Sequence, residues 1–336
     1  MPVTANIHKR VRFDRPGIIA YITAVCLLCW VGGYLVSLGF PIETHPTDTP
    51  GWLSICSFLP GKLFTYLIGF LLMVGGAFLV QRASYALVLI RDRSFLPFLF
   101  FILLLSTNAD FFPLKATSFG VFCLILAVYL LFTSYHDPFS AAKSFGAAFL
   151  IGLGSLLWVY ILWFIPLFWV GMYMFRSLNP RTFVASLLGL LSVYWILLGW
   201  AVWESDYSYF VVPLQSLFDF HFSFWSFSEW IEWVPLFIVA ILVILASVNI
   251  LTHEQGDSLR TREFLSFFML LVLWSVVPFF LYEQASVEFL HIIAIPSSTL
   301  IAHFFSVQRN RYTFWLMMAT IVVLPALLIL RFTWSF

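Results

Sequence analysis

Charged residues are scarce in this sequence. Only 10% of its 336 residues are Asp, Glu, Lys or Arg, whereas 62% are hydrophobic and 20% are aromatic, and the mean hydropathy is +0.98. A folded surface in water needs more polar groups than this composition supplies, so a lipid bilayer is the expected solvent and membrane lipid the expected partner. The net charge of +1 gives no argument for nucleic-acid binding, and we expect no nucleic-acid partner.

Cysteine and recognisable catalytic motifs are also scarce. The four cysteines, Cys26, Cys29, Cys56 and Cys123, lie in or beside apolar runs and form no disulfide framework. Cys26 and Cys29 have the CxxC spacing, but on a membrane helix two small packing residues are favoured over a redox pair or a metal site. The sequence contains no Walker A motif, no GxGxxG after a strand, no HExxH and no GxSxG. No metal site is predicted, and a divalent cation stays open as a cofactor.

Long apolar runs, by contrast, recur along the whole chain. A hydrocarbon core about 30 Å thick needs roughly 20 helical residues to cross it, with every backbone group paired inside the segment. The predicted spans cover residues 17–40, 63–80, 95–107, 118–135, a long stretch at 144–175, 183–203, 234–251, 264–282, 289–307 and 312–330. Basic residues precede the first span and no A-x-A-like cleavage site follows it, which predicts an uncleaved helix and not a signal peptide.

The stretch 144–175 is too long for one upright helix. Its thirty-two residues would make a helix of about 48 Å, whereas Pro166 and the aromatic pair Trp163 and Phe164 favour two short helices or a broken pair. Two crossings here give an all-α polytopic membrane protein with about 11 transmembrane helices, a cytoplasmic N-terminus and an external C-terminus.

The basic residues sort to one side in this arrangement, as the positive-inside rule requires. Three of them remain outside, namely Lys62, Lys115 and Arg331. The inner segments hold the other fourteen of the seventeen: Lys9, Arg10, Arg12, Arg15, Arg82, Arg91, Arg93, Lys143, Arg176, Arg181, Arg260, Arg262, Arg309 and Arg311. A single crossing at 144–175 would invert every later loop, so the charge pattern favours eleven crossings.

The longest segment between spans, 204–233, is aromatic throughout and has no basic residue. Because Trp and Tyr prefer the headgroup layer, it is predicted to lie along the outer membrane surface as a cap on the helices; guiding an amphipathic lipid substrate is the alternative. The chain is therefore predicted to be a single integral membrane domain over 1–336. It divides into a helical module at 1–203, the external aromatic interfacial loop at 204–233, and a C-terminal four-helix part at 234–336.

Polar groups of the outer loops form the candidate site, because they can meet both water and a lipid headgroup. A loop carboxylate can act as general base on an acceptor hydroxyl, and a lysine can hold a phosphate through charge-assisted bonds. The alternative is that these carboxylates are simply solvated and that the Pro-rich loop forms turns. The candidate catalytic residues are Glu43, Asp48 and Asp110. The candidate residues for binding substrate or lipid phosphate are Lys62, Lys115, His45 and Asn108.

The order of features between residues 91 and 200 resembles a known module. A basic inner turn leads to a short span with Pro97, an outer NADFFP segment, a span, a polar HDP turn and a Gly-rich pair of short helices before another span. This order resembles the N-terminal membrane module of GT-C type glycosyltransferases, polytopic enzymes that use lipid-phosphate sugars. The resemblance implies a GT-C-like architecture over 1–203 and a polyprenyl-phosphate sugar as substrate. It also implies that Glu43 or Asp48 is the base and Asp110 a supporting acid, although the Asp-Glu pair usual after the first helix is absent.

Most of the chain resembles a second group of proteins. The run RDRSFLPFLFFILLLSTNADFFP, followed by a Gly-rich hairpin, is similar to an uncharacterised family of multi-pass inner-membrane proteins from Bacteroidota. This resemblance implies a bacterial inner membrane as the location and brings no established function.

Few ionisable residues lie inside the predicted spans. His291 and His303 are twelve residues apart, about 18 Å along a helix, which is too far for a shared metal site. Glu283 and Glu288 lie near the outer end of the same span. An intramembrane ionisable group is a functional hypothesis, with a neutral histidine bonded to a neighbouring helix as the alternative.

Two functions follow from these observations. The leading one is a GT-C-like glycosyltransferase, or a protein that binds a lipid-linked sugar, at the external face. The alternative is a non-catalytic membrane carrier or a partner subunit of an envelope-assembly complex. Kinks at Pro278, Pro296 and Pro325 would suit a carrier, but the chain shows no convincing inverted repeat of the kind many carriers have.

Overall fold

The computed structural model describes residues 23–24, 27–28, 30–35, 49–59, 61–90, 94–108, 111–220, 230–252, 258–282, 285–307 and 311–334, without the side chains of 230–232 and 328–334. Over these residues the regular structure is helical, with no β-strand. The elements are α2 (Pro50–Phe58), α3 (Lys62–Leu87), α4 (Leu96–Leu105), α5 (Ala116–Thr133), α6 (Ala141–Ser155), the 3₁₀ helix η2 (Val159–Trp163), α7 (Phe164–Met174), α8 (Pro180–Glu204), α9 (Ser208–Phe218), α10 (Trp230–Thr252), α11 (Leu259–Leu281), α12 (Ser286–Val307) and α13 (Arg311–Trp334).

Six helices in the described part of the chain are long and apolar enough to cross a membrane, namely α3, α5, α8, α10, α11 and α12. The structure thus supports the predicted class, an α-helical membrane protein with several spans. The remaining apolar helices are shorter: α4, for example, has ten residues and a length of about 15 Å. The total of eleven crossings stays a prediction.

The stretch 144–175 turns back on itself as two helical segments, α6 and η2–α7. The turn before α6 contacts the turn after α7, since the His136 N–H donates to the Phe175 carbonyl at 3.0 Å and Asn179 Nδ2 donates to the Pro138 carbonyl at 2.7 Å. A helical pair, and not one long helix, is therefore present here, as its length predicted.

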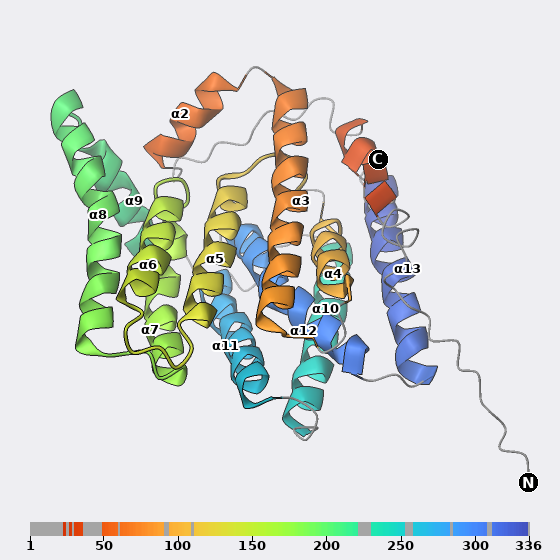
Figure 1. Cartoon of the computed structure of the whole chain (residues 1–336). Helices are drawn as coiled ribbons and strands as arrows, with labels where there is room; N and C mark the ends of the chain where they lie inside the picture. Colours follow the sequence, from red (N-terminus) through yellow and green to blue (C-terminus); the bar gives the residue numbers. More distant parts are fainter. Residues whose placement is uncertain are drawn as a thin grey trace, which may run out of the picture.

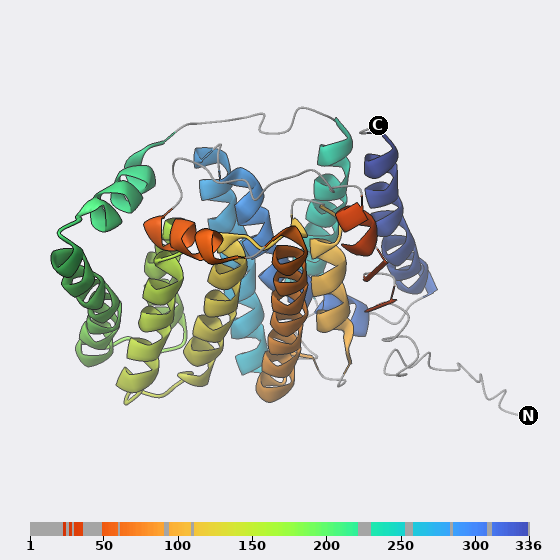
Figure 2. The ribbon, with the colours of Figure 1, turned by 90° about the horizontal axis from the view of Figure 1, so that it is seen from above.

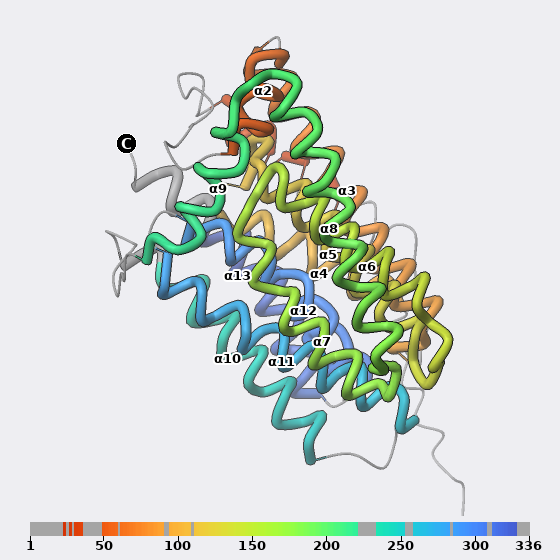
Figure 3. The backbone as a smooth tube through the Cα atoms, turned by 90° about the vertical axis from the view of Figure 1, so that its left-hand side faces the viewer, coloured from red at the N-terminus to blue at the C-terminus, as the bar shows by residue number. Residues whose placement is uncertain are grey.

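The helices pack in two layers (Figures 1 and 2). One layer contains α8, α6, α5 and α3 in this spatial order, and the other contains α11, α12 and α4, flanked by α10 and α13. The centre of the bundle is α12, which packs on α4, α11, α10 and α5 and has 78% of its apolar window buried. The short helices α2 and α9 lie at one end of the bundle (Figures 1 and 3).

Both short helices belong to segments that the sequence predicted as outer loops. The first begins with Thr49 as N-cap, whose Oγ1 accepts from the Trp52 N–H at 3.3 Å, and Pro50 occupies the first helical position. The Thr49 hydroxyl also donates to the Leu157 carbonyl at 2.8 Å, which fixes α2 to the turn after α6. The second, α9, occupies part of the predicted aromatic loop at 204–233.

The outer faces of the peripheral helices are apolar. Trp195 and Ile196 on α8 are 76% and 69% exposed, and Phe237 on α10 is 61% exposed. Large apolar surfaces of this kind are unfavourable in water and are matched by lipid tails. The exposed faces therefore agree with a membrane as solvent.

The two ends of the bundle differ in charge. We call the end with the α5–α6 and α7–α8 turns the basic end. The opposite end, with residues 106–108 and 111–115 and the turn at 156–158, we call the aromatic end. Among the described residues, the basic end carries Arg82, Lys143, Arg176, Arg181, Arg260, Arg262 and Arg311 with the acids Asp137 and Glu263. The aromatic end carries Lys62 and Lys115 with the acids Glu204, Asp206, Asp219 and Glu288. This difference in charge agrees with the predicted distribution of basic residues. The side of the membrane that each end faces stays a prediction.

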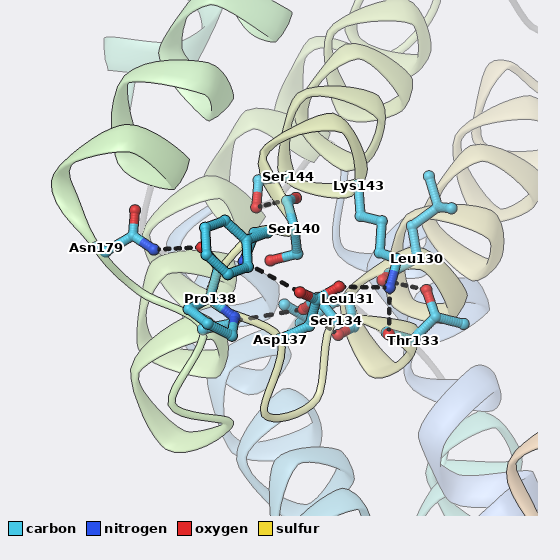
Figure 4. A network of polar contacts seen from close by, with 12 residues as sticks. Leu130, Leu131, Thr133, Ser134, Asp137, Pro138, Ser140, Lys143, Ser144 and Asn179 are labelled. Carbon is cyan, nitrogen blue, oxygen red and sulfur yellow. Dashed lines mark hydrogen bonds and ion pairs between the residues drawn. The ribbon is translucent and has the colours of Figure 1, made fainter.

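A polar network closes the α5–α6 turn at the basic end (Figure 4). Lys143 Nζ donates to Asp137 Oδ2 at 3.0 Å and to the Thr133 carbonyl at 2.8 Å, and the Phe139 N–H donates to Asp137 Oδ1 at 3.0 Å. The hydrogen bond from Lys143, followed by that from Phe139, lowers the pKa of Asp137 below its ordinary value. The network fixes the turn that starts the α6–α7 pair.

Helices α6 and α8 approach each other through glycine. A Cβ added at Gly189 would lie 2.3 Å from the carbonyl oxygen of Phe145, and one added at Gly152 would lie 3.1 Å from Val193. The first of these contacts is with backbone, so a side chain at residue 189 can be accommodated only if the helices separate.

We expect Gly189→Ala to lower the free energy of unfolding by about 1–3 kcal/mol, because it overpacks the α6–α8 contact. Thermal unfolding of the purified protein in lipid nanodiscs would measure the change. Gly199→Ala on the same helix is the control: no atom lies within 4 Å of its added Cβ, and it should be neutral or slightly stabilising. Equal losses in both variants would contradict the close α6–α8 packing.

We expect Asp137→Asn to lower the unfolding temperature slightly at neutral pH, because the ion pair with Lys143 is exposed. The folded pKa of Asp137 lies below its unfolded value, so its contribution is present above an unfolded pKa of about 4 and is lost as the pH falls through the folded pKa. Unfolding curves recorded over a pH series should therefore converge in acid. If the difference in unfolding temperature between the two proteins stays constant down to pH values far below the unfolded pKa, this ion pair is excluded as its cause.

Candidate functional site

The structure places some of the predicted site residues. The structure describes three of the seven predicted site residues, namely the candidate binding residues Lys62, Asn108 and Lys115. The other four predicted residues, Glu43, His45, Asp48 and Asp110, lie outside the described residues. The predicted acids therefore stay predictions, and the site is built here from the groups around the lysines.

Lys62 and Lys115 come from different loops and lie at the same corner of the aromatic end. Lys62 is the first residue of α3, and one turn later the Thr65 carbonyl accepts from the Leu114 N–H at 3.1 Å. A Cβ added at Gly69 would lie 2.7 Å from the Phe112 carbonyl, so residues 111–115 lie closely on the first two turns of α3. Both lysines are partly exposed.

Lys115 is also the residue that starts α5. Its N–H donates to Ser118 Oγ at 3.4 Å, and its carbonyl accepts from the Ser118 N–H at 3.0 Å. An anion held by Lys115 would lie near the positive end of the α5 dipole.

The segment that precedes Lys115 connects this corner to the central helix α12. Asn108 is 8% exposed, and its carbonyl accepts from the Phe111 N–H at 3.2 Å. The Phe111 ring lies against the His291 imidazole, with 5.1 Å between the ring centroids. The predicted outer loop is therefore packed onto a buried histidine.

Glu288 and His291 stand one turn apart on α12 and on the same face. The Glu288 carboxylate is partly exposed and accepts from the indole N–H of the buried Trp158. His291 is 5% exposed and packs on Phe111, four residues before Lys115 in the chain. Lys115, Glu288 and His291 thus lie at the same end of the bundle, and we call these three residues the α12 site.

The sequence analysis identified each residue of the α12 site but did not predict that the three lie at the same end of the bundle. Lys115 was predicted as a phosphate ligand, whereas Glu288 and His291 were recognised only as ionisable groups in a span. The Glu-x-x-His spacing is the signal in the sequence, because it puts both side chains on one helical face. The contact between Phe111 and His291 depends on tertiary packing, which the sequence does not show.

Aromatic rings support the α12 site from the side of η2 and α9. Phe289 packs on Trp158 and Tyr160, with centroid distances of 5.0 and 6.1 Å. Trp163 Nε1 donates to the Tyr282 hydroxyl at 2.8 Å, and that hydroxyl donates to the Leu217 carbonyl of α9. The rings hold the first turn of α12 in place.

No group of three or more His, Cys, Asp and Glu side chains suited to a metal ion occurs in the described part of the chain, and this leaves the expectation about a divalent cation untested. A recess between α3, α5 and α12, lined by Val80, Ile125 and Thr299 among others, has a volume of about 20 Å³, close to that of one water molecule.

Comparison of the chain with protein families, with characterised proteins and with solved structures gave no match. The resemblances to the GT-C module and to the Bacteroidota family therefore stay hypotheses. A functional argument has to start from the geometry of the site.

Proposed function

We propose that this protein is a multi-pass protein of a bacterial inner membrane that binds a lipid-linked sugar at its aromatic end and acts on it in the manner of a GT-C-type glycosyltransferase. The observation that carries the proposal is the backbone bond from Leu114 to Thr65, which brings the residue before Lys115 to within one helical turn of Lys62. Two ammonium groups from separate loops suit one phosphate or pyrophosphate group.

The position of this corner suits a lipid headgroup. Apolar side chains cover the flanks of the bundle, and polar and aromatic groups gather at its ends. A polyprenyl chain would lie against the apolar flank while its phosphate meets the lysines at the level of the headgroups. The excess of arginine at the basic end supports an external location for the aromatic end.

The acids supply the second part of the proposal. Glu43 and Asp48 precede α2 in the chain, and Asp110 directly precedes Phe111, which packs on the α12 site. A carboxylate among these would take the proton of an acceptor hydroxyl as that hydroxyl attacks the sugar, and the lipid phosphate would leave.

We expect Lys62→Gln and Lys115→Gln each to weaken the binding of a polyprenyl-phosphate sugar roughly tenfold, because each removes a charge-assisted contact worth about 1.4 kcal/mol. Native mass spectrometry of nanodiscs with increasing amounts of the lipid would measure binding. Arg181→Gln, an exposed residue at the basic end, is the matched control and should leave binding unchanged. Binding that is unchanged in both lysine variants would refute the phosphate site.

We expect Asp48→Asn and Asp110→Asn to lower sugar transfer to a hydroxyl acceptor by roughly 100-fold or more if each acts in proton transfer, with binding of the donor lipid nearly unchanged. Release of polyprenyl phosphate from a radiolabelled donor would measure the rate. Asp219→Asn, an exposed acid of the aromatic end, is the control. Normal binding without any transfer in the unmodified protein would instead favour the non-catalytic carrier or assembly subunit.

A further inference from the structure

One arginine of the basic end is held in place by aromatic rings. Arg260, in the first turn of α11, is exposed, and its guanidinium carbon Cζ lies 5.6 Å from the ring centroid of Tyr135 and 5.2 Å from that of Phe264. Within the described part of the chain the guanidinium takes part in no hydrogen bond and no ion pair. Its position is therefore fixed by the rings, and its N–H donors stay available to an acceptor.

Stacked rings lead from Arg260 to the recess between α3, α5 and α12. The Phe264 ring, on which the guanidinium lies, stacks on the Phe132 ring with 4.3 Å between the centroids and 7° between the planes. Phe132 is one of the residues that line the recess. The cation and the recess thus share a wall of two stacked rings.

A second contact joins the first turn of α11 to the other side of the recess. Thr261, the residue after Arg260, donates from its hydroxyl to the Val88 carbonyl at 3.5 Å. The residues on either side of Val88, which are Leu87 and Leu89, both line the recess. The recess therefore begins at the basic end, beside the turn that carries Arg260.

The recess itself is apolar. Its volume of about 20 Å³ has room for one small group. Tyr129 and Thr299 are the lining residues with a side-chain oxygen, and the Thr299 hydroxyl already lies at 3.4 Å from the Ile295 carbonyl, to which it donates. A water molecule needs two to four polar partners, so a methyl or methylene group suits this space better.

The lining of the recess reaches the flank of the bundle. Ala83 on α3 and Tyr129 on α5 line it and are partly exposed, and these two helices are neighbours in one layer (Figures 1 and 2). The flank is the surface that meets lipid chains. A chain that lies along α3 and α5 can therefore place one of its groups in the recess.

An anionic phospholipid combines the two kinds of group in this order. Arginine binds phosphate oxygens through paired, charge-assisted hydrogen bonds, and the phosphate of a bilayer lipid lies at the level where the helices end. A free phosphate ion would use Arg260 alone and would leave the recess without an occupant. A zwitterionic lipid carries its own cation, which competes with the arginine for the phosphate.

We propose that an anionic phospholipid of the bilayer binds at the basic end between α3, α5 and the first turn of α11. Its phosphate pairs with Arg260, and one acyl chain lies along α3 and α5 with a group inserted into the recess. The lipid then connects the two layers of helices, since α3 and α5 belong to one layer and α11 to the other. This site is at the opposite end from Lys62 and Lys115 and does not depend on the proposed function.

Two lipids with identical acyl chains test the headgroup contact, namely phosphatidylglycerol and phosphatidylcholine, each titrated into the detergent-solubilised full-length protein and counted by native mass spectrometry. The unmodified protein should bind phosphatidylglycerol about fivefold more tightly. Arg260→Gln should remove this preference, because one arginine near the headgroups contributes about this factor. Arg181→Gln, an exposed arginine of α8 at the same end, is the control and should keep the preference.

Ala83→Leu tests the acyl chain, because it fills the mouth of the recess without changing charge. It should weaken the binding of both lipids severalfold. Ala86→Leu is the matched control, since Ala86 is exposed on the same helix and does not line the recess. The two tests alter different helices, so if one variant fails to fold the other still decides.

Three results would overturn the inference: equal binding of the two lipids by the unmodified protein, equal losses in Arg260→Gln and Arg181→Gln, or equal binding in Ala83→Leu and Ala86→Leu. Polyprenyl-phosphate binding at the aromatic end should be unchanged in Arg260→Gln. A failure of this inference is therefore distinguishable from a failure of the proposed function.

Discussion

An apolar solvent cannot hydrogen-bond to a protein, and this constraint governs the whole molecule. Each backbone N–H and C=O that leaves water must find a partner in the chain, which is why helices make up the regular structure over the described residues. Gln81 illustrates the constraint inside the bundle. Its side chain, 3% exposed, donates to the Ser94 carbonyl at 2.9 Å and accepts from the Phe98 N–H at 3.2 Å. One buried amide thus satisfies the start of α4, whose ten residues are all buried.

The same constraint decides where chemistry can occur. Polar side chains on the flanks of α3, α8 and α10 would face lipid, and those surfaces are apolar. Ionisable groups are therefore concentrated at the two ends, where water and headgroups are available. Helix α12 differs from the others, because it is buried along most of its length and still carries the ionisable residues Glu288 and His291 in its first two turns. Burying such groups costs free energy unless they are bonded, and the indole of Trp158 supplies a bond to Glu288.

Much of the fold could be predicted from the sequence, because hydropathy and helix length report directly on the bilayer. The predicted span 118–135 corresponds to α5, and 289–307 corresponds to α12. The span predicted at 63–80 ended too early, since α3 continues to Leu87. The prediction stopped at polar Gln81 and Arg82, whereas the structure bonds Gln81 to the next helix. Hydropathy cannot detect a polar group whose partner is supplied by tertiary packing.

The short helices and the site were harder to predict for the same reason. The signals for α2 were present, with Thr49 as a cap and Pro50 at the first position, but a proline-rich loop favoured turns. For the site, the sequence identified Lys115, because it lies in a predicted outer loop, where a lysine can hold a lipid phosphate. It did not show that the loop before Lys115 packs on His291, since a contact between residues so far apart depends on the packing of α4 and α12.

The burial of α12 also determines what kind of ligand its first turns can meet. Helices α4, α5, α10 and α11 pack around it, and its first turn, with the partly exposed Glu288, lies at the aromatic end. A ligand that arrives there comes with its polar group first, and the apolar flank of the bundle is left for its tail. An amphipathic lipid has this form, and a small soluble substrate gains nothing from the apolar flank. This geometry supports the proposed ligand, a lipid with a polar head.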